Sequence, residues 1–265
     1  MYSTAKRPGN VVPRADWDRP PWNRWAFQHI REILPTAEVW RGTGAIRPFK
    51  AEPQDFDELT VSSVNGTATT LRHLLDETYT DGFLVLHKGK IVYERYFTGM
   101  TDRTLHLSQS VAKSFTGALA GILAGQGVID PTRLVSHYVP ELAATAYAGA
   151  TLQHVLDMRS GVEFEEAYTD PHSDIGQTDV ASGWKPIPAD ADPSFKWPGH
   201  LFEQVLGLKS KVREHGVNFE YRSIETDVAA FCMERATGKR LPQLLSEELW
   251  QKLGMEESGC FTVDP

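Results

Sequence analysis

Two short patterns in the chain place side chains that could carry out nucleophilic catalysis. Ser110 is followed three positions later by Lys113, and Tyr221 is followed two positions later by Ser223. A serine hydroxyl is a weak nucleophile until a base removes its proton, and residues three apart on a helix share one face. A tyrosine near a lysine ammonium can have its pKa lowered from about 10, which makes the phenolate a base at neutral pH. These residues therefore supply a candidate nucleophile and two candidate bases.

The surroundings of each pattern decide how much weight it carries. A Ser-x-x-Lys pattern is expected about once by chance in a chain of this length, and three copies occur here, at Ser3/Lys6, Ser110/Lys113 and Ser182/Lys185. Only Ser110 opens a predicted helix, whose first turn adds N–H groups and positive potential for a developing oxyanion. The alternative is that Ser110 only caps that helix and Lys113 is solvated. For Tyr221 the alternative is an exposed tyrosine whose hydroxyl contacts water.

The elements that would position these residues are predicted from hydrophobic periodicity and from Gly and Pro signals. Helices are predicted over residues 23–34, 71–79, 111–125, 151–161, 225–237 and 242–253. A β-hairpin is predicted over residues 82–97, with its turn at Lys88-Gly89. Residues 165–200 are rich in Pro, Gly and Asp without a clear period. A loop of that length in a compact domain is usually functional.

Composition excludes several classes of protein. The 265 residues are 41% hydrophobic and 23% charged, which is enough to form a sizeable core. A net charge of −8 provides no basic surface for nucleic acid. There is no apolar run of about 20 residues and no secretory signal, so we expect a cytoplasmic protein that does not bind membranes. The two cysteines, Cys232 and Cys260, lack the spacing of a metal site. We expect no cofactor and no metal, and the sequence leaves a homodimer open.

The order of three motifs resembles that of a known superfamily. Ser110-Val-Ala-Lys113, then Thr151-Leu-Gln-His-Val-Leu-Asp-Met-Arg-Ser-Gly161, then Tyr221-Arg-Ser223 is similar to the arrangement in the β-lactamase and penicillin-binding-protein-like serine hydrolases. Within that superfamily the chain looks most like the nylon-oligomer (6-aminohexanoate-dimer) hydrolases. This likeness runs from end to end and is carried by Pro-Pro-Trp-Asn-Arg-Trp-Ala-Phe at residues 20–27 and by residues 78–81, 83–86 and 138–142.

The resemblance implies a fold and a set of site residues. The fold would be α+β and β-lactamase-like, with an antiparallel sheet flanked by helices plus an all-helical region. An extended arm, residues 1–21, would precede a hydrolase domain of residues 22–265. Ser110 would be acylated, Lys113 and Tyr221 would handle its proton, and the Ser110 N–H would supply half of an oxyanion hole. Tyr168, Asp179 and Trp184 match positions that line the substrate pocket in those hydrolases, and the alternative is that they belong to a solvated loop.

Two departures from the family pattern lead to further expectations. Arg222 stands where a smaller residue is usual, and we expect it to narrow the cleft. The family's third motif, Lys/His-x-Gly, has no suitable match, because His87-Lys-Gly89 lies in the hairpin turn and Lys252-Leu-Gly254 ends a helix. We expect that motif, and further strands, beyond residue 265. The domain would then be truncated at its C-terminus, just after a strand that starts near Phe261, and inactive or poorly soluble alone.

The favoured function is a serine hydrolase that cleaves linear amides of the 6-aminohexanoate-oligomer type and short carboxylic esters through an acyl-enzyme on Ser110. Its partner would be a small-molecule amide or ester substrate. One alternative is a D-alanyl peptidase or β-lactamase-type enzyme, which the lack of an export signal disfavours. A second alternative is a non-catalytic binding protein, or an inactive fragment, on the same fold.

Overall fold

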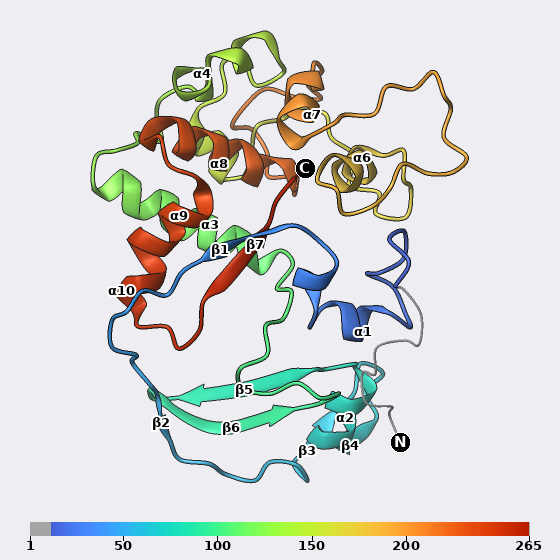
Figure 1. Cartoon of the computed structure of the whole chain (residues 1–265), viewed down its shortest axis with the longest axis vertical. Helices are drawn as coiled ribbons and strands as arrows, with labels where there is room; N and C mark the ends of the chain where they lie inside the picture. Colours follow the sequence, from blue (N-terminus) through green and yellow to red (C-terminus); the bar gives the residue numbers. More distant parts are fainter. Residues whose placement is uncertain (1–11, 265) are drawn as a thin grey trace. The chain divides into compact units, whose positions relative to one another are not determined.

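The structure, a computed structural model, describes residues 12–264, and these divide into two compact units (Figure 1). Unit 1 holds the described residues up to Ile33 together with Ile46–Leu107. Unit 2 holds Leu34–Ala45 and the described residues from Ser108 onward. The hydrolase domain expected for residues 22–265 draws on both units. Among the described residues, no helix is long and apolar enough to cross a membrane.

The sheet of unit 1 is built on the predicted hairpin. Strands β5 (Gly82–His87) and β6 (Lys90–Tyr96) pair antiparallel, so the hairpin is confirmed. Lys88 and Gly89 have φ values of 51° and 75°, and a two-residue type I′ turn requires positive φ at both positions. Strand β2 (Lys50–Ala51) pairs with β6 in parallel, so the sheet is not purely antiparallel.

The rest of unit 1 contains short elements. Strands β3 (Thr60–Ser62) and β4 (Ala68–Thr70) form a separate antiparallel pair, which leads into α2 (Leu71–Glu77). The Thr70 hydroxyl accepts the His73 N–H and caps this helix. The helix predicted over residues 71–79 is therefore confirmed, although it ends two residues earlier.

The N-terminal part of unit 1 differs from the prediction. The single helix expected over residues 23–34 is instead α1 (Asn23–Ala26) followed by a 3₁₀ turn, η1 (Ile30–Glu32). The ring of His29 stacks on Trp25 and its Nδ1 contacts the Trp25 carbonyl at 2.8 Å, so a side chain competes for a backbone acceptor. The described part of the predicted arm, residues 12–21, is not extended. It forms hydrogen-bonded turns that bury Trp17 completely, because burial of a large apolar ring is favourable. Residues 1–11 of that arm lie outside the described residues.

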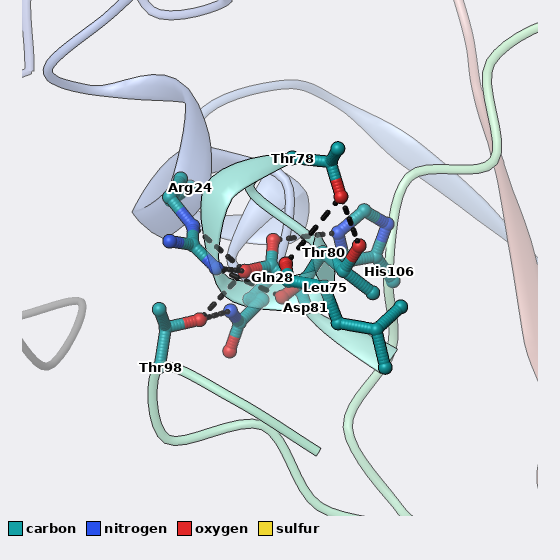
Figure 2. Close-up of polar contacts among 8 residues, drawn as sticks. All are labelled: Arg24, Gln28, Leu75, Thr78, Thr80, Asp81, Thr98 and His106. Atoms are coloured by element: carbon teal, nitrogen blue, oxygen red, sulfur yellow. Dashed lines mark hydrogen bonds and ion pairs between the residues drawn. The ribbon is translucent and has the colours of Figure 1, made fainter. Parts of the chain in front are cut away.

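A buried carboxylate connects several segments of unit 1 (Figure 2). Asp81 accepts hydrogen bonds from Arg24 Nε and Nη2, from Thr98 Oγ1 and from the His106 ring. Burial alone would raise the pKa of Asp81, but these hydrogen bonds outweigh burial and lower it. The hydrogen bond to Asp81 raises the pKa of His106, against the effect of burial. These groups bond to one another, so we assign the cluster a structural role.

Unit 2 is mainly helical and has one small sheet. Its helices are α3 (Val111–Gly125), α4 (Val135–Tyr138), η2 (Pro140–Ala144), α5 (Leu152–Leu156), α6 (Asp174–Ala181), α7 (Leu201–Gly207), α8 (Ile224–Thr237), α9 (Leu241–Leu245), the π-helical η3 (Ser246–Trp250) and α10 (Gln251–Leu253). The core lies where α8 packs against α3, α4 and α5 (Figure 1). The helices predicted over 111–125, 225–237 and 242–253 are confirmed, whereas α4, η2, α6 and α7 were not predicted.

Strands from distant parts of the sequence form the sheet of unit 2. Strand β1 (Thr36–Val39) pairs antiparallel with β7 (Gly259–Thr262), so that Thr36 faces Thr262 and Val39 faces Gly259 (Figure 1). The strand predicted to start near Phe261 is confirmed. Strand β1 was missed because the four residues after Pro35 are too few to show an alternating pattern.

The segment after α5 carries a glycine that its surroundings require. Thr151 caps α5 as predicted, but the helix ends at Leu156 rather than at Gly161. Gly161 has φ of 69°, its carbonyl accepts the Val212 N–H at 2.9 Å, and a Cβ placed on it would overlap the carbonyl oxygen of Arg213. A side chain at this position would push residues 212–213 away from Gly161 and break the hydrogen bond between Val212 and Gly161.

We expect Gly161→Ala to lower the free energy of unfolding by at least about 3 kcal/mol, because it combines a left-handed φ with a backbone overlap. Gly238→Ala is the matched control. Gly238 has φ of 70°, and a Cβ there would meet none of the described atoms within 4 Å. Gly238→Ala should lower the free energy of unfolding by only about 1 kcal/mol. Denaturant unfolding measures both values, and equal losses would show that the overlap at Gly161 is relieved without cost.

Candidate active site

Three side chains predicted from the sequence meet at the start of α3. Lys113 Nζ donates a hydrogen bond to Ser110 Oγ at 3.2 Å, and Tyr221 Oη donates one at 2.8 Å. Lys113 Nζ also lies 5.2 Å from the centre of the Tyr221 ring. The Ser110 oxygen thus contacts two groups that could remove its proton, one from its own helix and one from a segment more than a hundred residues away.

Local backbone geometry presents Ser110 at the helix end. Ser110 occupies the N-cap position of α3, where unpaired N–H groups and the helix dipole favour negative charge. The preceding residue, Gln109, has φ of 49°, which is uncommon for a residue other than glycine. Buried Leu119, Ala120 and Leu123 anchor α3 in the core of unit 2. This tight entry into a fixed helix sets the position of the Ser110 hydroxyl.

Tyr221 lies between two anchored residues. On one side, the Glu220 N–H donates to the Met158 carbonyl at 3.0 Å. On the other side, the Ser223 N–H donates to a Glu166 carboxylate oxygen, and α8 begins at the next residue. The side chain of Tyr221 reaches Ser110 from this segment while 38% of the residue stays exposed.

The charges around Tyr221 shift its ionisation. Burial would raise the pKa of its hydroxyl, but the hydrogen bonds to Ser110 and Lys113, together with the Lys113 charge, outweigh burial and lower the pKa below its ordinary value. Asp227 on α8 also interacts with Lys113. Burial raises the pKa of Asp227 to about 7, an effect that Lys113 opposes and Asp264 reinforces.

Sequence reasoning missed Glu166 and Asp227. Asp227 lies in the first turn of the predicted helix 225–237, four residues after Ser223, so it could have been considered as a neighbour of the site. Glu166 gave no comparable signal, because only the fold brings residues 166 and 223 together.

Tyr168, one of the predicted pocket residues, adjoins this group. Although 61% of Tyr168 is exposed, burial of its hydroxyl and a hydrogen bond to Glu166 raise its pKa to about 12. Ser223 and Tyr221 also act on that hydroxyl. Tyr168 therefore lies at the edge of the cluster formed by Ser110, Lys113 and Tyr221.

The other two predicted pocket residues are held by different contacts. Asp179 lies on α6 and forms an ion pair with Lys185, with 3.2 Å between Oδ2 and Nζ. Trp184 follows α6, and its Nε1 donates to Thr262 Oγ1 on β7 at 3.1 Å. The carboxylate expected to receive a substrate ammonium is thus already paired with a lysine.

The expectation that Arg222 narrows the cleft is wrong. Only 1% of Arg222 is exposed, and its guanidinium pairs with Glu220 and approaches Glu225 inside unit 2. Tyr221 and Arg222 are adjacent, and only the tyrosine has an appreciably exposed side chain. A buried arginine was not expected, because Arg is almost never fully buried unless it is paired.

The other residues considered from the sequence occupy turns, helix ends or caps. Lys88-Gly89 forms the hairpin turn, and Gly254 ends α10 with φ of 70°. His154 Nδ1 accepts the Thr151 N–H within a capping box. Within residues 12–264, no group of three or more His, Cys, Asp or Glu side chains is arranged to hold a metal ion.

Several known proteins are similar to this chain in sequence or in fold. The chain is 38% identical to the 6-aminohexanoate-dimer hydrolase of Paenarthrobacter ureafaciens over 98% of its own length and 63% of that relative. A Bacillus anthracis structure provisionally named a 6-aminohexanoate-dimer hydrolase matches with a TM-score of 0.88 and 32% identity, over 98% of this chain and 66% of that one. A shorter segment is 36% identical to a β-lactamase of Providencia stuartii over 63 residues, which is 24% of this chain and 16% of that protein. The chain therefore spans just under two thirds of the first two relatives.

A family assignment follows from the extent of these matches. Residues 64–265 match the Beta-lactamase family, and this range includes Ser110, Lys113 and Tyr221. The match covers most of the chain, and the likeness to the solved structure extends over nearly all of it. The fold is the α+β, β-lactamase-like fold predicted from the sequence, and the chain belongs to the Beta-lactamase family.

Proposed function

We propose that this chain carries the nucleophile of a serine hydrolase that cleaves linear amides of the 6-aminohexanoate-oligomer type and short carboxylic esters. The observation that carries the proposal is the Ser110 oxygen, which accepts hydrogen bonds from both Lys113 and Tyr221. A serine that only capped a helix would not need two such neighbours. The names of two relatives that match 98% of this chain support the choice of substrate class.

The proposed reaction has two steps, acylation of Ser110 and hydrolysis of the acyl-enzyme. Ser110 Oγ attacks the substrate carbonyl carbon while its proton passes to the Tyr221–Lys113 pair, and the Ser110 N–H stabilises the oxyanion at the start of α3. The C–N or C–O bond then breaks, and the leaving amine or alcohol takes that proton, which leaves an acyl-enzyme. Water adds to the acyl carbon and gives its proton to the same pair. The bond to Ser110 then breaks, so that the carboxylic acid leaves and the serine hydroxyl is restored.

The ionisation of Tyr221 supports its role as the immediate base. Its hydrogen bond to Ser110 is shorter than that of Lys113, 2.8 Å against 3.2 Å. Its pKa is lowered by the bonds to Ser110 and Lys113 despite burial. A base is most effective when its pKa lies near the working pH, so lowering the pKa of a tyrosine moves it in the useful direction.

Substrate selection is proposed to involve Asp179, Tyr168 and Trp184. A 6-aminohexanoate oligomer carries a free ammonium group away from the scissile bond, and the Asp179 carboxylate offers a counter-charge. In the structure Lys185 occupies that carboxylate, so the substrate ammonium would compete with the Lys185 ammonium for Asp179. A neutral ester has no ammonium and should not depend on this exchange.

The nucleophile can be tested with a fluorophosphonate label followed by intact-mass analysis. If residues 1–265 alone are inactive, as expected from the sequence, the assays use the chain with a C-terminal continuation that restores turnover. The wild type should then gain one adduct on Ser110, and Ser110→Ala should lose the adduct and lower kcat for a nitrophenyl ester by about 10⁴-fold or more. Ser182→Ala is the matched control, because Ser182 also begins a Ser-x-x-Lys pattern. It should keep both the label and turnover. An adduct on Ser182 or Ser223 would reject the assignment and favour a non-catalytic role for Ser110.

The coupling between Lys113 and Tyr221 can be tested by titration. Lys113→Met removes a hydrogen bond and a charge that lower the Tyr221 pKa, which leaves burial as the main influence. The Tyr221 pKa should therefore rise, and the alkaline shift should be visible as tyrosinate absorbance in a difference titration against Tyr221→Phe. A Tyr221 titration that does not move would mean that Lys113 does not act on it.

The role of Asp179 can be tested by comparing two substrate types. Asp179→Asn should reduce kcat/KM for amino-terminated amides by about 10 to 100-fold, the size of a hydrogen bond to a charged group, and spare neutral esters. Lys185→Met, which removes the ammonium that competes for Asp179, should keep or improve activity on the same amides. Equal losses on amides and esters in Asp179→Asn would indicate a structural role instead.

A further inference from the structure

A cluster of charged side chains next to Tyr221 in the sequence centres on the buried Arg222. Arg222 Nη2 donates to Glu220 Oε2 at 2.5 Å, and its Nη1 donates to the Glu220 carbonyl at 3.3 Å. The same Nη1 lies 4.0 Å from Glu225 Oε1 on α8. The side chains of Arg222 and Glu225 are 1% and 0% exposed. One guanidinium thus connects the residue before Tyr221 to the first turn of the helix after it.

This cluster is itself attached to the rest of unit 2. The Ser160 hydroxyl donates to Glu225 Oε1 and accepts the Val162 N–H at 3.2 Å. Arg213 donates to the same Glu220 oxygen that Arg222 contacts. The chain around residues 160–162, the chain around residue 213 and α8 therefore all connect to the two carboxylates that Arg222 approaches.

The energetics of this cluster argue against stability as its only role. Burying a charge costs several kcal/mol, and apolar residues of similar volume are often as stabilising as a buried ion pair. Moreover, Arg222 Nε, Glu225 Oε2 and Tyr147 Oη are buried without a hydrogen-bond partner among the described residues. Burial raises the pKa of Glu225 to about 7 despite the opposing effects of Ser160 and Arg222. Directional bonds from a rigid guanidinium do provide a fixed position for the backbone, which apolar packing defines less closely.

We propose that Arg222 is a positioning residue: by joining Glu220 to Glu225 behind Tyr221, it fixes the Tyr221 hydroxyl within hydrogen-bonding distance of Ser110. This inference rests on the proposed function, in which Tyr221 handles the Ser110 proton. Tyr221 is partly exposed, so its own packing restrains it only in part. A displacement of about 1 Å at a reacting group can lower a rate by about 100-fold.

The first experiment compares variants of Arg222 in the full chain, using a neutral nitrophenyl ester. Arg222→Met, which keeps an unbranched side chain but removes the charge, should lower kcat by about 10 to 100-fold with little change in KM. Arg222→Lys should recover part of the loss, because an ammonium can still bond to Glu220. Leu75→Ala is the control for lost stability, since Leu75 is a buried residue of α2 and lies outside the core that packs α8 against α3. It should unfold more easily while keeping wild-type kcat.

The second experiment asks whether Arg222 acts through the Tyr221 hydroxyl. If it does, Arg222→Met should change kcat by less than about threefold in a Tyr221→Phe background, because the group that it positions is already absent. A purely structural role would give the same loss in both backgrounds and would overturn the inference, as would an unchanged kcat in Arg222→Met alone. Should Arg222→Met not fold, Arg222→Lys and Glu225→Gln permit the same comparison.

The two proposals fail in different ways. Wild-type kcat in Tyr221→Phe would contradict the proposed function itself, whatever Arg222 does. A large loss in Tyr221→Phe combined with an unchanged Arg222→Met would contradict only the positioning role.

Discussion

The candidate site depends on one long-range hydrogen bond, between Tyr221 Oη and Ser110 Oγ. Lys113 reaches Ser110 through helix geometry alone, since the two residues lie three apart at the start of α3. Tyr221 reaches it only because α8 packs against α3, which brings residues 111 positions apart within 2.8 Å. The core of unit 2 therefore does more than stabilise the fold. It sets the distance on which proton transfer would depend.

The parts of the fold that were predicted are those with a local physical cause. The Lys88-Gly89 turn identified the hairpin, because few residues accept two successive positive φ values. Helix α3 was predicted because its apolar residues recur on one face. The helix expected over residues 23–34 also had that periodicity, yet it breaks where the His29 side chain takes a backbone acceptor. Periodicity reports which face is buried but cannot show such a competition.

The candidate site also contains some residues that local sequence spacing predicts and others that only the fold reveals. Ser110, Lys113 and Tyr221 could be selected from motif spacing, because the chemistry itself imposes that spacing. Glu166 and Arg222 could not be interpreted from spacing, since their positions depend on which distant segments pack around the start of α8. Arg222 shows this most clearly. From the sequence, a charged residue beside a tyrosine with a proposed catalytic role is expected to line the cleft, and only the carboxylates near Arg222 explain why it is buried.

The residues proposed to act in catalysis and those proposed to select the substrate are held by different interactions, which affects how such a site can change. Ser110, Lys113 and Tyr221 are fixed by α3, α8 and the buried charges behind them, where a substitution disturbs a packed core. Asp179 forms an ion pair with Lys185, and Trp184 donates a hydrogen bond to β7. An ion pair between partly exposed side chains contributes little to stability, so breaking the Asp179–Lys185 pair should cost little. In such an arrangement substrate preference can change by substitutions around α6 while the Ser110–Tyr221 distance, and with it the chemistry, stays the same.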